Sequence, residues 1–201
     1  MMKPYRITDL LAEYQYGNKS TVVNVVEGDS YTLVPKLRSE VIDFAFIRDR
    51  DDSDNDFSKT LFAVDSLCVV VPADHKLARR DCVEISQLEG ESLLLIGKDA
   101  FMYKLCIELC KNAGFYPRVT FTSHRAENLS HLVSRGMGIT MLMKTPAATL
   151  ISDRVKLIDV TPTFKTRIYP AWLPNRKMGL HAKKFLELAR KLDDKCDHHG
   201  L

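Results

Sequence analysis

The chain lacks the features that mark membrane-spanning, secreted or disordered proteins. None of its apolar runs approaches the roughly 20 residues that a membrane-spanning helix needs. Its opening stretch, MMKPYRITDLLAEY, carries polar groups every few positions, unlike the apolar core of a signal peptide. With 45% hydrophobic residues in 201 positions, the composition excludes disorder and allows a sizeable core. We therefore expect a cytoplasmic protein of one domain or of two small interleaved ones.

The chain also has no large excess of charge of one sign. Lys and Arg number 29 against 26 for Asp and Glu, which gives a net charge of +3. A chain that holds phosphates by itself needs a dense basic surface. Nucleic acid is therefore not expected as the direct partner of this segment.

The cysteines show neither a disulfide framework nor a CxxC motif. There are five, an odd number, and Cys68, Cys106 and Cys110 fall in apolar periodic segments. We expect these three to be reduced thiols of the core. The stretch CDHH, residues 196–199, is an alternative metal site, but it lies in a polar tail that is expected to fray.

The acidic stretch RDRDDSDNDFS, residues 48–58, is expected to be a solvated loop. It lacks the Gly at the sixth position and the Glu at the twelfth that an EF-hand calcium loop requires. We expect neither a metal nor a cofactor.

Strand-like and helix-like segments alternate along the chain, which favours parallel-sheet units. The predicted strands cover residues 21–27, 41–49, 66–75, 92–97, 116–122, 139–143 and 167–174, and the predicted helices cover 30–40, 99–113, 123–135 and 180–192. Asp99 and Ser123 are expected to cap two of these helices. Between the third helix and the next strand stand Gly136 and Gly138, which predict a left-handed helix end and an immediate turn into the strand.

Five motifs follow one another in an order that resembles a known family. They are NVVEGDSYTLVPKLRSEVIDFAF, LCVVVPADHKLA, SLLLIG, HLVSRGMGITMLM and YPAWLPNRKMGLHAKKFLELARKL. In this order and spacing they are similar to the effector-binding domain of LysR-type transcriptional regulators. The resemblance covers nearly the whole chain.

The resemblance implies an α/β fold of the two-lobe, type II periplasmic-binding-protein kind, in which each lobe is a mixed sheet flanked by helices. It assigns residues 1–65 and 175–201 to a first lobe and residues 66–174 to a second, with LCVVVP and RIYPAWLP as hinge strands. The domain's own first strand is expected to be missing, because ITDLLAEY already has the pattern of the first helix. The helix-turn-helix segment through which such regulators bind DNA is absent from these 201 residues.

The function implied by the resemblance is sensing of a small molecule, without enzyme activity. The effector is expected to be a small anion or a zwitterion that binds in the cleft between the lobes and changes lobe and dimer geometry. Strand ends and helix N-termini suit such a ligand, because their free N–H groups favour anions. The expected partners are this effector and further copies of the chain in a homodimer or higher oligomer. DNA is expected as a partner only through the missing segment, and a membrane is not expected.

Eight residues form the candidate effector site. Asp29 and Ser30 lie in the loop before the first-lobe helix, where the family has a ligand-contacting hydroxyl. In the second lobe, two helix starts are expected to bring N–H donors together with cationic side chains. These are Gly97, Lys98 and Asp99 at one start, and Thr122, Ser123 and His124, with Arg125, at the other. Ordinary solvated cations near a helix start are the alternative interpretation.

Two other functions share this architecture. A secreted solute-binding protein would have the same cleft but needs an export signal. An enzyme such as a prephenate dehydratase is suggested only by TRI at residues 166–168, which differs from the Thr-Arg-Phe signature in its third residue. No Ser, Cys or His stands in a nucleophile motif such as GxSxG.

Overall fold

The computed structural model describes residues 2–50 and 56–196 of the chain. The acidic stretch at 51–55 and the tail from residue 197, which holds both histidines of the CDHH stretch, lie outside the described residues. The chain separates into two compact units, Met1–Val64 with Thr166–Leu201, and Asp65–Lys165. The first unit is discontinuous in sequence, whereas the second is one continuous stretch.

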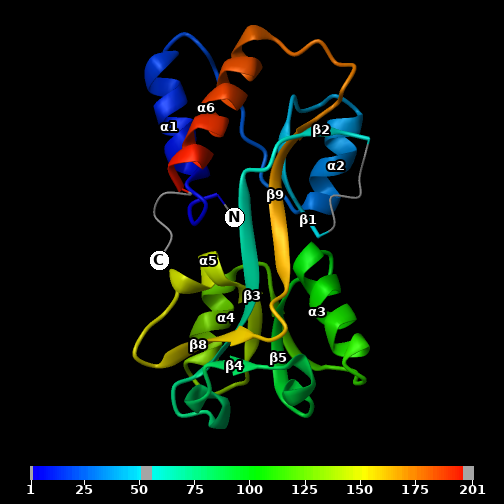
Figure 1. Cartoon of the computed structure of the whole chain (residues 1–201), viewed down its shortest axis with the longest axis vertical. Helices are drawn as coiled ribbons and strands as arrows, with labels where there is room; N and C mark the ends of the chain where they lie inside the picture. Colours follow the sequence, from blue (N-terminus) through cyan, green and yellow to red (C-terminus); the bar gives the residue numbers. More distant parts are fainter. Residues whose placement is uncertain (1, 51–55, 197–201) are drawn as a thin grey trace. The chain divides into compact units, whose positions relative to one another are not determined.

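The first unit has a small sheet covered by helices (Figure 1). Its elements in chain order are α1 (Ile7–Gly17), α2 (Ser30–Arg38), β1 (Ala45–Asp49), β2 (Ser58–Lys59), β9 (Lys165–Trp172) and α6 (Leu180–Cys196). The helices predicted over residues 30–40 and 180–192 are confirmed as α2 and α6. Strand β9 carries the chain back from the second unit to the first.

Strand β9 belongs to the sheet of the first unit. It runs antiparallel to β1, with Ala45 opposite Ala171 and Asp49 opposite Arg167. Strand β2 also pairs with β9. Because of this pairing the compact units change over between residues 165 and 166, whereas the predicted lobes changed over between 174 and 175.

Alternate residues of β1 point to opposite faces of this sheet, as the pleat requires. Phe46 packs in a cluster with α1 and α6, where its ring centroid lies 6.5 Å from that of Phe185. Ala45 and Ile47 pack in a separate cluster with Leu37 of α2. Helices α1 and α6 therefore cover one face of the sheet together, and α2 covers the other.

The prediction of a strand over residues 21–27 is wrong. This segment carries the valine-rich pattern of a strand, but no strand is found between Thr21 and Gly28. Val22 is 83% exposed and Val25 is 51% exposed. A β-strand needs a hydrogen-bonded neighbour as well as a suitable sequence. In the described part of the chain, no pairing with another strand reaches this segment.

The second unit contains most of the strands. Its elements are β3 (Ala63–Pro72), the 3₁₀ helices η1 (Lys76–Arg79) and η2 (Ile85–Leu88), β4 (Cys82–Val83), β5 (Ser92–Ile96), α3 (Phe101–Asn112), β6 (Arg118–Ser123), α4 (Ala126–Val133), β7 (Thr140–Met143), α5 (Lys144–Ala148) and β8 (Val155–Val160). Strand β3 pairs antiparallel with β7 and with β8. Strand β4 pairs parallel with β8, and β5 pairs parallel with β6. The second unit therefore mixes parallel and antiparallel pairs.

The short connection from α4 to β7 has the predicted backbone. Gly136 has φ +73° and Gly138 has φ +153°, values that residues with a side chain rarely adopt. A Cβ atom on Gly138 would lie 2.2 Å from the carbonyl oxygen of Ser92 at the start of β5. The next residue, Ile139, donates its N–H to that same oxygen at 2.9 Å. The glycine thus lets the chain pass directly against β5.

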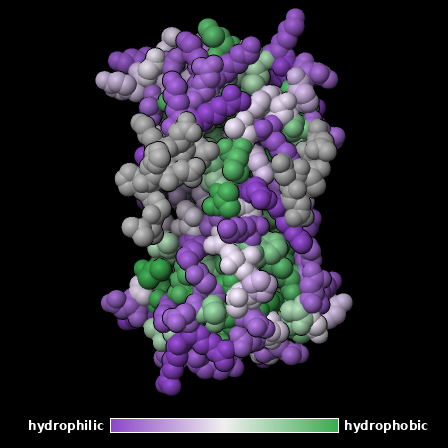
Figure 2. All heavy atoms as spheres, viewed as in Figure 1, coloured by the Kyte–Doolittle hydropathy of each residue, from purple (hydrophilic) through white to green (hydrophobic). Residues whose placement is uncertain are grey.

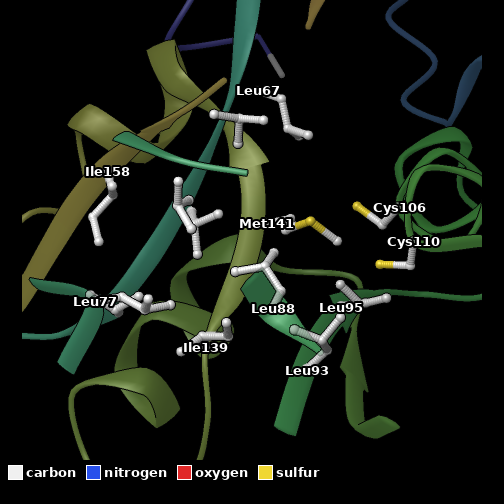
Figure 3. Close-up of a cluster of buried hydrophobic side chains, with 14 of the residues drawn as sticks. Leu67, Leu77, Leu88, Leu93, Leu95, Cys106, Cys110, Ile139, Met141 and Ile158 are labelled. Carbon is white, nitrogen blue, oxygen red and sulfur yellow. The ribbon is translucent and has the colours of Figure 1, made fainter. Parts of the chain in front are cut away.

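The larger core cluster of the second unit gathers apolar side chains from its strands and from α3 (Figure 3). Met141 of β7 and Leu95 of β5 are fully buried there, beside Cys106 and Cys110. Both cysteines, like Cys68 in β3, are buried free thiols, so the prediction of reduced core cysteines is confirmed for these three.

Thiol alkylation tests this core directly. Burial raises the pKa of Cys68 from 9.0 to about 12 and that of Cys110 from 9.0 to about 11, and it also raises the pKa of Cys106. A higher pKa leaves less reactive thiolate at a given pH, so at pH 8 Cys110 should hold about 100-fold less thiolate than a thiol of ordinary pKa. We expect iodoacetamide to label the exposed Cys82 in the native chain, and the three buried thiols only after unfolding. Peptide mass spectrometry measures this, and native labelling of Cys110 as fast as that of Cys82 would contradict it.

No helix among the described residues is both long enough and apolar enough to cross a membrane. On the face shown in Figure 2, hydrophilic residues predominate, and hydrophobic residues are visible among them.

Candidate functional site

The first unit presents its predicted site residues where α2 begins beside the end of β1. The Asp29 carboxylate caps α2 by accepting a hydrogen bond from the N–H of Tyr31 at 3.1 Å. The Ser30 hydroxyl accepts from the Arg48 N–H at 2.9 Å and donates to the Arg48 carbonyl at 3.3 Å. Both predicted residues therefore lie at one helix start, and the hydroxyl of Ser30 holds that start against β1.

The same end of β1 carries a buried cation that sequence reasoning missed. The Arg48 side chain is only 8% exposed. Its guanidinium donates to the Thr166 hydroxyl and, at 2.5 Å, to the Tyr5 hydroxyl, and its Cζ lies 5.3 Å from the centre of the Tyr5 ring. No ion pair with a carboxylate is found for Arg48 within the described residues. The two hydroxyls accept hydrogen bonds from the guanidinium, but neither they nor the ring neutralises its charge, so this place favours an anion.

A signal for Arg48 was present in the sequence. In VIDFAFIRD it follows directly on the apolar residues of a strand, where a charge is costly unless it is paired. Thr166 is the first residue of the TRI stretch that resembled a dehydratase signature. It is a buried residue of β9, and its hydroxyl accepts a hydrogen bond from the Arg48 guanidinium. Nothing local in the sequence links residues 5, 48 and 166.

In the second unit, the ends of the parallel strands β5 and β6 bring several predicted residues together. Ile96 pairs with Ser123, and the Gly97 N–H donates to the Ser123 carbonyl at 3.1 Å. A Cβ atom on Gly97 would lie 2.5 Å from Cε1 of His124, so the imidazole rests directly on the glycine. His124 Nδ1 lies 3.8 Å from an Asp99 carboxylate oxygen, with both side chains about three-quarters exposed (74% and 79%), so the pair is worth little.

The capping roles predicted for Asp99 and Ser123 are wrong. Helix α3 begins at Phe101 with the extended residue Ala100 at its N-cap, one residue beyond Asp99, and it has no side-chain cap. Helix α4 has Arg125 at its N-cap, and the Ser123 hydroxyl accepts from the Arg125 N–H at 3.1 Å and from the Asn128 amide at 3.3 Å. Ser123 thus closes the turn that precedes the helix.

Among the described residues, no contact joins the remaining predicted site residues of this unit to one another. Thr122 is half-buried in β6, opposite Leu95. Lys98 and Arg125 are exposed, and convergence of their side chains with His124 is not observed in the described structure. Gly97, Asp99, Ser123 and His124 are therefore the members that the structure brings together. No group of three or more His, Cys, Asp or Glu side chains that could hold a metal occurs in the described ranges.

A cavity of about 370 Å³ also lies within the first unit. It is bordered by residues 21–28, by Phe44 and Phe46 at β1, and by side chains of α1 and α6. None of the eight predicted site residues lines it, and neither does Arg48.

Comparison with known proteins extends over almost the whole chain. The family model described as the LysR substrate binding domain matches residues 1–193. The transcriptional dual regulator GltC of Bacillus subtilis is 26% identical over 170 residues, which are 84% of this chain and 53% of that protein. This chain spans about half the length of the curated relatives that it matches.

Solved structures show the same fold. The C-terminal domain of a probable LysR family transcriptional regulator from Rhodococcus sp. RHA1 has a TM-score of 0.79 at 23% identity, with 90% of both chains covered. The effector-binding domain of QuiR in complex with shikimate has a TM-score of 0.81 at 21% identity, with coverage of 100% of this chain and 94% of that one. The predicted fold class is confirmed by these matches.

Proposed function

This chain belongs to the LysR substrate binding domain family, whose model matches residues 1–193, and we propose that it senses a small anionic effector on behalf of a transcriptional regulator. The observation that carries the anionic part of the proposal is the buried guanidinium of Arg48, held by the hydroxyls of Tyr5 and Thr166. A buried charge is costly unless a counter-charge accompanies it. A carboxylate or phosphate ligand would supply that counter-charge and accept the charge-assisted hydrogen bonds of a guanidinium.

The start of α2 supports the same ligand class. Its first N–H groups carry the positive end of the helix dipole, and the Ser30 hydroxyl fixes them against the backbone of Arg48. The structural relative QuiR was solved with shikimate, which is a carboxylate. The Asp29 carboxylate at the same helix start opposes a ligand of high negative charge, so a monoanion or zwitterion fits better than a dianion.

Regulation of transcription is proposed for the longer protein of which such domains form part. The matched stretches cover 53% and 47% of two relatives, and both relatives are named as transcriptional regulators. For such regulators we propose that a helix-turn-helix, as in the name of the HTH-type relative TtuA, binds the DNA. Self-association, and the use of one effector by both units, stay predictions from the family resemblance.

A thermal-shift screen tests the effector class. The probes are a panel of small carboxylates with shikimate among them, inorganic phosphate, and the methyl esters of the carboxylates as neutral controls. A ligand at 100 times its Kd stabilises the folded chain by about 2.7 kcal/mol, which raises the Tm of a chain of this size by roughly 5–10 °C. We expect at least one anion to do this and its ester not to.

Two matched variants locate the site. Arg48→Met introduces an apolar side chain of similar length and removes the buried charge. We expect this variant to abolish the rise in Tm that the anion causes. Lys98→Met removes an exposed cation of the second unit and serves as the comparison. If no anion raises the Tm, or if Arg48→Met responds to the identified anion as the parent does, the proposal is wrong.

A further inference from the structure

We propose that the second unit carries a binding site for a soft monovalent metal ion of the Cu(I) class, formed by the sulfur atoms of Cys106, Cys110 and Met141. The two cysteines lie on α3 and the methionine lies on β7. All three side chains belong to one buried cluster. Figure 3 shows both cysteine sulfurs on the side of α3 that faces the sulfur of Met141. The site is separate from the anion site at Arg48, which belongs to the first unit.

The spacing of Cys106 and Cys110 suits a metal ion better than a disulfide. They stand four residues apart in one uninterrupted helix, where Cβ atoms lie about 5–6 Å apart. A disulfide needs Cβ atoms about 3.5–4.5 Å apart, and both cysteines are free thiols. Two metal–thiolate bonds of about 2.3 Å each span about 4.6 Å. An ion can therefore join the two sulfurs while the helix keeps its geometry.

Met141 supplies a third soft sulfur from β7. It stands opposite Val69 of β3 and is fully buried. The unbranched methionine side chain adapts to its neighbours, and in Figure 3 its sulfur points toward α3. Thiolates and thioethers favour Cu(I), whereas carboxylates and carbonyls favour Mg²⁺ and Ca²⁺. Structural Zn²⁺ takes four ligands, one more than these three sulfurs provide. The ligand set therefore selects a soft ion of low coordination number.

The charge balance of the cluster favours a monovalent ion. Burial raises the pKa of Cys110 from 9.0 to about 11, and burial together with the charge of Cys110 raises the pKa of Cys106. A thiolate at one position therefore opposes a thiolate at the other. Within residues 65–165, all of which the structure describes, no Lys or Arg is buried to offset a second thiolate. A net charge in an apolar core is costly, whereas one thiolate, one thiol, one thioether and one Cu(I) form a neutral site.

Binding exchanges one proton for one metal ion. The S–H bond of one cysteine breaks, a bond between that sulfur and Cu(I) forms, and the proton passes to the solvent. No electron is transferred, because the ion is Cu(I) before and after binding. Since one proton leaves for each ion bound, the apparent affinity should rise about tenfold per pH unit below the pKa of the thiol.

Competition for Cu(I) with the coloured chelator bicinchoninate tests the site on the whole chain, under nitrogen and with ascorbate as the reductant. The starting protein carries Cys82→Ser, which removes an exposed thiol, and Cys196→Ser, so that the three buried cysteines are its remaining thiols. We expect this protein to withdraw Cu(I) from the chelator, and native mass spectrometry to show a single ion on each chain.

Further substitutions in this starting protein locate the ion. Cys106→Ala and Cys110→Ala each remove one thiol and should lower the affinity for Cu(I) about 100-fold or more. Cys68→Ala is the matched control, because it removes a buried thiol that belongs to a different core cluster. Met141→Leu nearly conserves side-chain volume, so it should keep the fold and lower the affinity about tenfold. Circular dichroism checks that each variant is folded.

Four results would overturn the proposal. The first is a starting protein that withdraws no Cu(I) from the chelator. The second is an equal loss of affinity in Cys68→Ala and Cys110→Ala, which would show that the ion does not select the α3 pair. The third is a Met141→Leu variant that binds Cu(I) as its parent does. The fourth is a rise in affinity of about 100-fold per pH unit, which would show that two protons leave and that the bound site is not neutral.

Discussion

The Gly138→Ala variant should unfold roughly 10 °C below the parent chain. A side chain at φ +153° costs about 1–3 kcal/mol. The new Cβ atom would also lie 2.2 Å from the Ser92 carbonyl oxygen, a backbone atom that cannot rotate away. This overpacking should destabilise the fold by about 1–3 kcal/mol more. The sum is about 4 kcal/mol, and each kcal/mol lowers the Tm of a chain of this size by roughly 2–4 °C. Calorimetry or circular dichroism measures the shift.

Gly136→Ala is the matched control for this variant. Gly136 also has a positive φ, +73°, but a Cβ atom there meets nothing within 4 Å. It should therefore show only the cost of the left-handed backbone, about 1–2 kcal/mol. Equal losses in the two variants would mean that the approach to Ser92 contributes nothing.

Phe185→Ala should produce a loss of similar size in the first unit. Phe185 is 3% exposed, and its ring stacks on Phe44 at 5.0 Å and meets the edge of Tyr14 at 5.3 Å. Truncation of a buried Phe to Ala costs about 3–5 kcal/mol. We expect a fall in Tm of roughly 10 °C, measured in the same way.

Leu180→Ala in the same helix provides the comparison. Leu180 is 65% exposed, and substitutions at such positions usually change stability by less than about 0.5 kcal/mol. If Phe185→Ala were as mild as Leu180→Ala, α6 would not be part of the core described for the first unit.

Patterns that act over a few residues predicted most of the fold. The apolar stripe of residues 99–113 and the apolar run at 92–97 correspond to α3 and β5, because helix and strand periodicities are read within one segment. The pair Gly136 and Gly138 predicted a backbone geometry that only glycine adopts readily. The strand prediction for residues 21–27 was wrong for the opposite reason. A strand depends on a neighbouring strand, which can come from anywhere in the chain.

The candidate site was predictable only in part. Ser30 and His124 stand beside helix starts that the sequence reveals, and the structure places them there. The environment of Arg48 depends on Tyr5 and Thr166, which are separated from it by long stretches of chain and meet it only after folding. Contacts of this kind leave no periodic trace in a single sequence.

The discontinuity of the first unit also sets an order of events during synthesis. The second unit, Asp65–Lys165, is complete as soon as residue 165 has left the ribosome, whereas β9 and α6 of the first unit emerge last. Translation at about 5–20 residues per second means that residues 1–64 wait roughly 5–20 s for their partners. During this interval the apolar faces of α1 and β1 lack the cover that α6 and β9 later provide. Of the two units, residues 1–64 should therefore be the part that most needs a chaperone.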